Sequence, residues 1–140
     1  MSGSVRLPFE VVFSPRLGRV KWPRISAMII GPKASLRAQF LLDSGADVSL
    51  IPRSMGQDIG LSIKGAVKCE GRAVGGAFVP YYLCSVQVQI GDLRIPIRVG
   101  WSMIDQTRPI LGRLDVFELL DIDFRQHTNV MLLRPASNQA

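Results

Sequence analysis

Residues 85–99 constrain the fold more than any other part of this 140-residue chain. Apolar and polar residues alternate strictly from Ser85 to Ile90 and again from Leu93 to Val99, and only Gly91-Asp92 separates the two runs. A period of two places one set of side chains on a buried face and the other set in water, and two such connecting residues are typical of a tight turn. The stretch therefore predicts an antiparallel hairpin in a mostly β fold.

The other predicted strands are shorter and are bounded by turn residues. Apolar runs interrupted by Gly, Pro, Asn or Ser predict strands at residues 10–13, 25–30, 35–42, 63–67, 110–111, 121–124 and 129–133. Residues 100–108 are expected to be irregular. Pro52 and Gly60 bound one or two helical turns. A second short helix should begin near Val116, because Asp115 followed by Glu118 is an N-cap pattern.

The predicted strand 35–42 ends at a carboxylate on a tight turn, Asp43-Ser44-Gly45. Apolar residues lie on both sides of this turn, and Gly45 allows another part of the chain to approach the backbone closely. An acid in this position is held rigidly and partly shielded from water, which suits proton transfer. The same residues also favour an ordinary Asx turn at the surface, so the turn alone leaves both interpretations open.

A second motif is rich in glycine. Gly71, Gly75 and Gly76 lie between apolar strand residues and favour the tip of a mobile hairpin, with Val74 as its aliphatic residue. A hairpin with no function beyond turning the chain is the simpler interpretation of this segment.

The third motif is the apolar pair Ile110-Leu111, followed by Gly112, Arg113 and the predicted helix. In this order, the three motifs resemble the retropepsins, the retroviral-type aspartic proteases, over about residues 25–133. The order is more specific than any single motif, because unrelated β-rich domains have no reason to carry all three. One departure concerns Leu114, which stands where the family often has a polar residue directly after the arginine.

The resemblance implies a retropepsin-like closed β-barrel or sandwich with a flap hairpin and one short C-terminal helix. The implied protease domain spans residues 23–135. Residues 1–22 form an N-terminal extension without a counterpart in the family, and residues 136–140 form a C-terminal tail.

The resemblance also implies roles for individual residues. Asp43 would be the catalytic aspartate, Ser44 the hydroxyl that ties two catalytic turns together, and Gly45 a backbone contact to substrate. The implied substrate-binding residues are Ala46, Asp47, Val48, Gly71, Val74 and Ile110, and the implied flap consists of Gly71, Arg72, Ala73, Val74, Gly75 and Gly76. Asp47 and Arg113 are expected to form a partly buried ion pair that braces the catalytic turn against the final helix.

Aspartic-protease chemistry needs two carboxylates, because one must hold a proton while the other accepts one from the attacking water. This chain has a single Asp-Ser-Gly, and its other acids lie in different contexts. The second aspartate is therefore expected from a second copy of the chain in a two-fold homodimer. The predicted function is an aspartic endopeptidase that hydrolyses extended polypeptides. A non-catalytic retropepsin-like dimerisation or peptide-binding module is the alternative, because folds outlive functions.

Composition argues against several other functions. The chain has 17 basic and 11 acidic residues, but the basic residues are scattered and no aromatic run alternates with them, which favours a solvated surface over nucleic-acid binding. Two cysteines, Cys69 and Cys84, and one histidine, His127, occur at no metal-ligand spacing, so no metal or other cofactor is expected. A serine hydrolase is disfavoured, because there is no Gly-x-Ser-x-Gly motif.

The sequence also bears on where the protein resides. No apolar run approaches the roughly 20 residues that a membrane helix needs, and the N-terminal residues do not resemble a signal peptide. We therefore expect cytoplasmic residence, either as a separate protein or as a soluble domain of a longer one.

Overall fold

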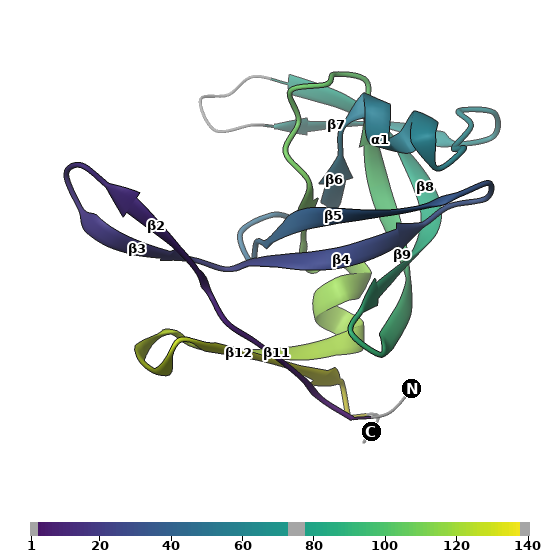
Figure 1. Ribbon diagram of the computed structural model, residues 1–140. Helices are drawn as coiled ribbons and strands as arrows, with labels where there is room; N and C mark the ends of the chain where they lie inside the picture. The colour runs from purple at the N-terminus through teal and green to yellow at the C-terminus, as the bar shows by residue number, and fades with distance from the viewer. Residues whose placement is uncertain (1–2, 73–77, 138–140) are drawn as a thin grey trace.

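The computed structural model describes residues 3–72 and 78–137 of the chain (Figure 1). Its longest strands, β8 (Phe78–Ile90) and β9 (Leu93–Ser102), form the antiparallel hairpin that the alternation predicts, with Ile90 opposite Leu93. Buried and exposed residues alternate along β9 as far as Val99. Each large aliphatic side chain buried on this face stabilises the fold by about 1.5–3 kcal/mol before the entropy cost is counted.

Six strands close into a barrel around this hairpin. The order around the ring is β4, β5, β10, β6, β9 and β8, and β8 bonds back to β4. The other ring strands are β4 (Arg24–Ile30), β5 (Ser35–Leu42), β6 (Ser49–Ile51) and β10 (Ile110–Leu111). Inside the ring lies a core of buried apolar side chains that includes Ala27, Ile29, Phe40, Val88, Ile95 and Leu111. Strand β7 (Val67–Arg72) pairs with the first half of β8 and lies outside the ring.

Two smaller sheets lie beside the barrel. Strands β1 (Val5–Leu7), β11 (Leu120–Arg125) and β12 (Val130–Pro135) form an antiparallel sheet below it (Figure 1), which includes the hairpin predicted near the C-terminus. Strands β2 (Glu10–Ser14) and β3 (Gly18–Trp22) form a separate hairpin that projects from the barrel; we call residues 10–22 the arm. The domain limits at 1–22, 23–135 and 136–140 remain predictions.

Both predicted helical segments are present. Helix α1 (Arg53–Asp58) begins after Pro52, and the chain leaves it through Gly60 at φ +85°. The second segment, η1 (Arg113–Phe117), is interrupted, because Leu114 and Asp115 have non-helical dihedral angles. Regular helical geometry therefore starts near Val116, as predicted. A short 3-10 turn, η2 (Gln126–Thr128), joins β11 to β12.

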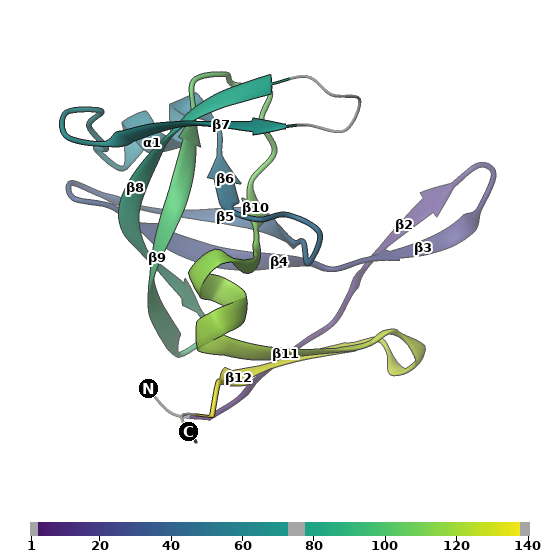
Figure 2. The same ribbon diagram turned by 180° about the vertical axis from the view of Figure 1, so that it is seen from behind.

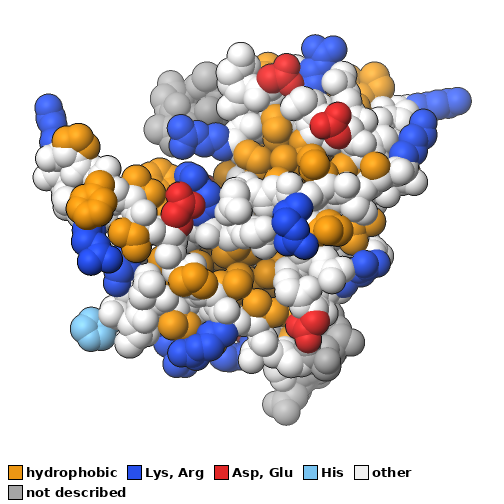
Figure 3. Space-filling view, viewed as in Figure 1, with side chains coloured by type: hydrophobic (Ala, Val, Ile, Leu, Met, Phe, Trp, Pro, Cys, Tyr) orange, Lys and Arg blue, Asp and Glu red, His pale blue; other side chains and the backbone are white. Residues whose placement is uncertain are grey.

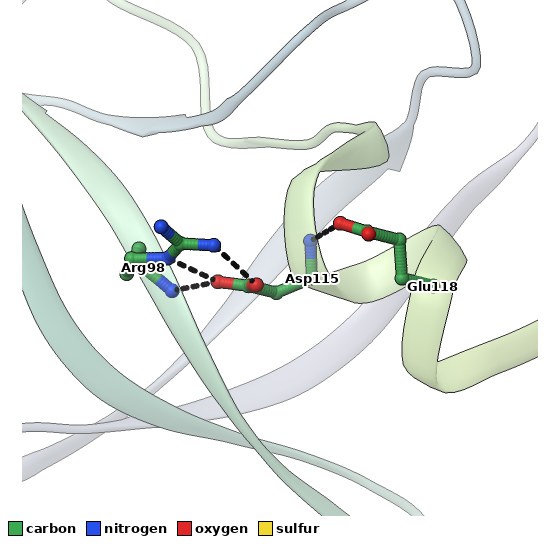
Figure 4. A network of polar contacts seen from close by, with 3 residues as sticks. All are labelled: Arg98, Asp115 and Glu118. Atoms are coloured by element: carbon green, nitrogen blue, oxygen red, sulfur yellow. Dashed lines mark hydrogen bonds and ion pairs between the residues drawn. The ribbon is translucent and has the colours of Figure 1, made fainter.

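The Asp115 carboxylate bonds to Arg98 instead of capping its own helix (Figure 4). It accepts three hydrogen bonds from Arg98, from the backbone N–H at 2.7 Å, Nε at 3.0 Å and Nη2 at 2.9 Å. Glu118 Oε1 accepts from the Asp115 backbone N–H at 3.0 Å, which is half of a capping box. Side-chain hydrogen bonds from Arg98 lower the pKa of Asp115, although burial acts in the opposite direction. The network attaches the final helix to β9.

Two predictions of where strands begin or end are wrong. Residues 63–66 form a turn instead of a strand, because Gly65 adopts φ +77° and the Ala66 N–H bonds to the Ile63 carbonyl, so β7 begins only at Val67. Conversely, residues 100–102 are part of β9 and not irregular. They pair with β6 and β8 at a place where a Cβ on Gly100 would come within 2.6 Å of Leu50.

Within the part of the chain that the structure describes, no helix combines the length and apolar character required to span a bilayer.

Candidate active site

Asp43 lies directly after β5, where several hydrogen bonds fix it. Its backbone N–H donates to the Leu111 carbonyl at 2.9 Å, and its own carbonyl accepts from Ala46 at 3.2 Å. The Gly45 N–H donates to Asp43 Oδ1 at 2.9 Å. This last contact is an Asx-turn bond, but the turn is not a free surface loop, because Asp43 is half-buried and bonded to β10. The turn is therefore an Asx turn, and it is also attached to the barrel through β10.

Strand β10 supports the Asp43 turn from the other side. It lies between β5 and β6, so that Ile110 pairs in parallel with Leu41 and antiparallel with Leu50 (Figure 2). The chain then passes beneath the turn at Gly112, whose N–H donates to the buried Ser49 Oγ at 3.0 Å.

The residues after Gly112 continue this attachment. The Arg113 N–H donates to the Ala46 carbonyl and the Leu114 N–H to the Asp47 carbonyl, both at 2.9 Å. Consecutive backbone groups of the third sequence motif therefore hold the first motif in place. This explains why a short apolar strand and a glycine must follow one another here, since the bond at residue 113 uses only its backbone N–H.

A pocket of about 420 Å³ opens beside Asp43. It brings together seven of the residues expected in the site, namely Asp43, Gly45, Ala46, Asp47, Val48, Gly71 and Ile110. Ser44 is exposed on the same turn and is not among the lining residues. Ala73, Val74, Gly75 and Gly76 of the expected flap lie outside the described residues, whereas Gly71 and Arg72 end β7.

Comparison with known proteins identifies a family for this chain. The sequence model of the aspartyl protease family matches residues 25–113, which is more than half of the chain. The chain belongs to this family. A comparison with curated proteins gave no match.

Two solved structures illustrate the retropepsin-like fold of this aspartyl protease family member. A retropepsin-like aspartic protease from Rickettsia conorii has 16% identity and a TM-score of 0.60, over 94% of this chain and 90% of that chain. EIAV protease complexed with the inhibitor HBY-793 has 24% identity and a TM-score of 0.50, over 71% of this chain and 88% of that chain. At such identities the likeness concerns the fold.

Four pocket residues of this family member were not expected from its sequence, namely Leu50, Glu70, Val79 and Tyr81. Tyr81 lies in β8 opposite Cys69, and its ring is 3.3 Å from where a Cβ of Gly71 would lie. Burial raises the pKa of Tyr81, as do Cys69 and Asp47 to a smaller extent, so the phenol keeps its proton at neutral pH. For Glu70, Val79 and Tyr81 the only sequence signal is the pairing of β7 with β8, and the register of that pairing cannot be predicted across an uncertain turn. Leu50 lies in β6, two residues after Val48.

Arg113 and Asp47 form an ion pair through Nη2 and Oδ1. The expectation of a partly buried pair is wrong, because the Arg113 side chain is 57% and the Asp47 side chain 86% exposed. Exposed pairs contribute at most about 1 kcal/mol to stability, because water screens the charges. The backbone bonds from Arg113 and Leu114 therefore brace the turn more than the ion pair does.

The structure also bears on metal ligands and thiols. Cys69 and Cys84 are both free, and burial raises the pKa of Cys84, so it stays a neutral thiol. Across residues 3–72 and 78–137, no three His, Cys, Asp or Glu side chains cluster as metal ligands.

Proposed function

We propose that this chain is an aspartic endopeptidase of the retropepsin type, active as a homodimer to which each subunit contributes Asp43. The observation that carries the proposal is the position of Asp43, whose backbone is bonded to β10 and whose carboxylate accepts from Gly45 N–H, at a pocket lined by a strand, a hairpin and a tight turn. The sequence has no second Asp-Ser-Gly, so a second aspartate in the same context must come from another copy.

In the proposed reaction, the two Asp43 carboxyl groups share one proton, because like charges a few ångströms apart cannot both ionise. The ionised carboxylate accepts a proton from water, and the water oxygen attacks the peptide carbonyl carbon. The protonated carboxyl donates its proton to the carbonyl oxygen. When the tetrahedral intermediate collapses, the C–N bond breaks and the leaving nitrogen takes up the proton that the first carboxylate accepted from water. One hydroxyl of the intermediate returns its proton to the other carboxylate as the carbonyl reforms, so the pair again shares one proton.

The pocket suggests the form of the substrate. Ala46, Val48 and Ile110 are small or aliphatic, which suits apolar side chains next to the cleaved bond. Strand β7 lies outside the barrel ring, where an extended peptide can bind through backbone hydrogen bonds. We propose that Asp47, Gly71 and Val74 complete the peptide-binding surface, with residues 71–76 as the flap and Ser44 as a tie between the two turns.

The decisive test is Asp43→Asn, which keeps the shape of the side chain but prevents proton transfer. With a mixed peptide library as substrate, cleavage should fall by at least about 10²-fold, the lower range for loss of general acid–base catalysis. Asp92→Asn makes the same chemical change at an exposed hairpin turn and should keep full activity. Equal cleavage by Asp43→Asn and wild-type protein would reject the assignment.

A mixing experiment tests whether the site is shared. Excess Asp43→Asn chains should inhibit wild-type protein by forming inactive heterodimers, and specific activity should fall on dilution below the dimer Kd. A wild-type protein that dimerises and binds peptides but cleaves none would instead be the non-catalytic module. Cytoplasmic residence is likewise a prediction, and cell fractionation would test it.

A further inference from the structure

The arm, residues 10–22, exposes more apolar surface than a free hairpin should. Phe13 and Leu17, close to its tip, are each 76% exposed, and Val11 and Val12 are also exposed. Figure 3 shows hydrophobic and basic side chains gathered on this projection at the left of the view. Exposed apolar patches rimmed by charged residues mark interaction sites.

The base of the arm is fixed beside the Asp43 turn. The Pro23 carbonyl, directly after β3, accepts from the Leu42 N–H at 2.8 Å, and Leu42 is the neighbour of Asp43. Lys21 Nζ donates to the Gln126 carbonyl at 2.8 Å, which ties β3 to the loop between β11 and β12. The direction of the arm is therefore set by the body of the protein.

The arm extends from the side of the barrel on which the Asp43 turn lies. In Figures 1 and 2, the end of β5, the loop that follows it and the arm all point to the same side, together with the tip of the β11–β12 hairpin. A molecule that covers the Asp43 turn and extends across this side of the barrel therefore reaches the arm.

We infer that the arm clasps the second copy of the chain in the homodimer. The inference rests on the proposed function, because a shared site requires two Asp43 turns to meet and so places the partner against this side of the barrel. In a two-fold dimer the same surface meets itself, so each arm contacts the partner near the partner's own Asp43 turn.

The chemistry of the arm fits this partner. Val11 pairs with Lys21 and Phe13 with Arg19, so one face of the hairpin carries both apolar and cationic side chains. Near its own turn, the partner presents the carboxylate of Asp47, which is 86% exposed and is bonded to its own Arg113 through Oδ1. Apolar burial then provides most of the contact, and the opposite charges favour one orientation over others.

The test measures the dimer Kd by sedimentation equilibrium for the full chain. Phe13→Ser/Leu17→Ser should raise the Kd at least about 10-fold, equivalent to about 1.4 kcal/mol. The matched control, Ile63→Ser/Val67→Ser, removes two other exposed apolar side chains and should leave the Kd within about 3-fold, equivalent to roughly 0.6 kcal/mol. Circular dichroism should match wild type for both variants, because all four side chains are exposed in the monomer. The Tm of the control should also match, whereas that of the arm variant should fall only by the amount that its weaker dimer accounts for.

Arg16→Glu/Arg19→Glu provides a second variant without a change in apolar surface. It should also raise the Kd, and the difference from wild type should shrink at high salt because salt screens exposed charges. An unchanged Kd in both arm variants would overturn the inference. If they keep the dimer but lose co-sedimentation with phosphatidylglycerol vesicles, the arm binds an anionic membrane and the inference is equally overturned.

The outcomes separate this inference from the proposed function. A dimer that the arm variants weaken, but that cleaves no peptide in its wild-type form, would support the arm contact and reject the protease. Cleavage lost in Asp43→Asn, together with an unchanged Kd in the arm variants, would support the protease and reject the arm contact.

Discussion

Gly112 lies against the backbone of Val48 with no room for a side chain. A Cβ on Gly112 would come within 2.5 Å of both the carbonyl carbon and the oxygen of Val48, and within 2.9 Å of the Ala46 oxygen. The strand–Gly–Arg motif and the Asp43 turn are therefore in direct backbone contact. Several substitutions can test how much the site depends on this contact.

Gly112→Ala should destabilise the fold and impair peptide cleavage. The φ of −97° suits any residue, so the cost arises from the collision with Val48, at about 1–3 kcal/mol for forced overpacking. Thermal unfolding and the peptide-library assay measure the two effects. Gly65→Ala is the control: it has open space but φ +77°, so it should lower the Tm and leave cleavage intact. A Gly112→Ala protein with wild-type Tm and activity would contradict the structure.

Ser49→Ala should cost about 1–3 kcal/mol, because the buried Gly112 N–H loses its acceptor. Ser85→Ala changes the same residue type at an exposed position of β8 and should stay within about 0.5 kcal/mol of wild type. Urea unfolding of both variants gives the comparison. Equal midpoints for the two variants would show that the Ser49 hydroxyl does not hold Gly112.

Asp115→Asn should lower the Tm at pH 7 but much less at acid pH. Because hydrogen bonds from Arg98 lower the pKa of Asp115 in the folded state, the unfolded state binds more protons in the acid range. This stabilisation is complete above the ordinary aspartate pKa of about 3.9 and is lost as the pH falls through the lowered value. Thermal melts of wild-type and variant protein from pH 7 to pH 3 should therefore converge. A gap that stays constant with pH would exclude the ionised pair as its cause.

Arg113→Ala should change stability by less than about 1 kcal/mol, because its pair with Asp47 is exposed. The backbone N–H of residue 113 still donates to Ala46 in this variant. Added salt should leave the difference in Tm from wild type small. A loss as large as that for Gly112→Ala would mean that the ion pair supports the turn more than its exposure indicates.

The sequence predicted where the strands and helices lie along the chain better than which strands pair with one another. Alternation placed residues 85–90 and 93–99 in one hairpin, and the apolar run before Asp43 located the end of β5. It could not show that the two-residue strand β10 would insert between β5 and β6, because two apolar residues carry no periodicity. The strand limits at Gly65 and Gly100 were mispredicted for a related reason. A sequence does not show whether a glycine adopts a positive φ, as Gly65 does, or admits a close neighbour, as Gly100 does.

From the residues alone, the candidate site was predictable only where residues are close in sequence, whereas Gly71 and Ile110 were expected from the family resemblance. Asp43, Gly45, Ala46, Asp47 and Val48 belong to one turn and reach the pocket together. Tyr81 and Glu70 reach it through the register of β7 against β8, which the glycine-rich segment leaves open. The exposure of the Asp47–Arg113 pair depends on the surface around it, and motif order carries no information about that surface.

The insertion of β10 between β5 and β6 also determines when the Asp43 turn can form during synthesis. The turn is held by Leu111 through Leu114, so just over seventy residues must follow Asp43 out of the ribosome before all its supports exist. Closing so long a segment is entropically costly and slow compared with forming the local hairpins. A nascent chain thus carries the Asp-Ser-Gly turn without its supporting framework until translation has passed residue 114, which delays any proteolytic activity until the barrel can close.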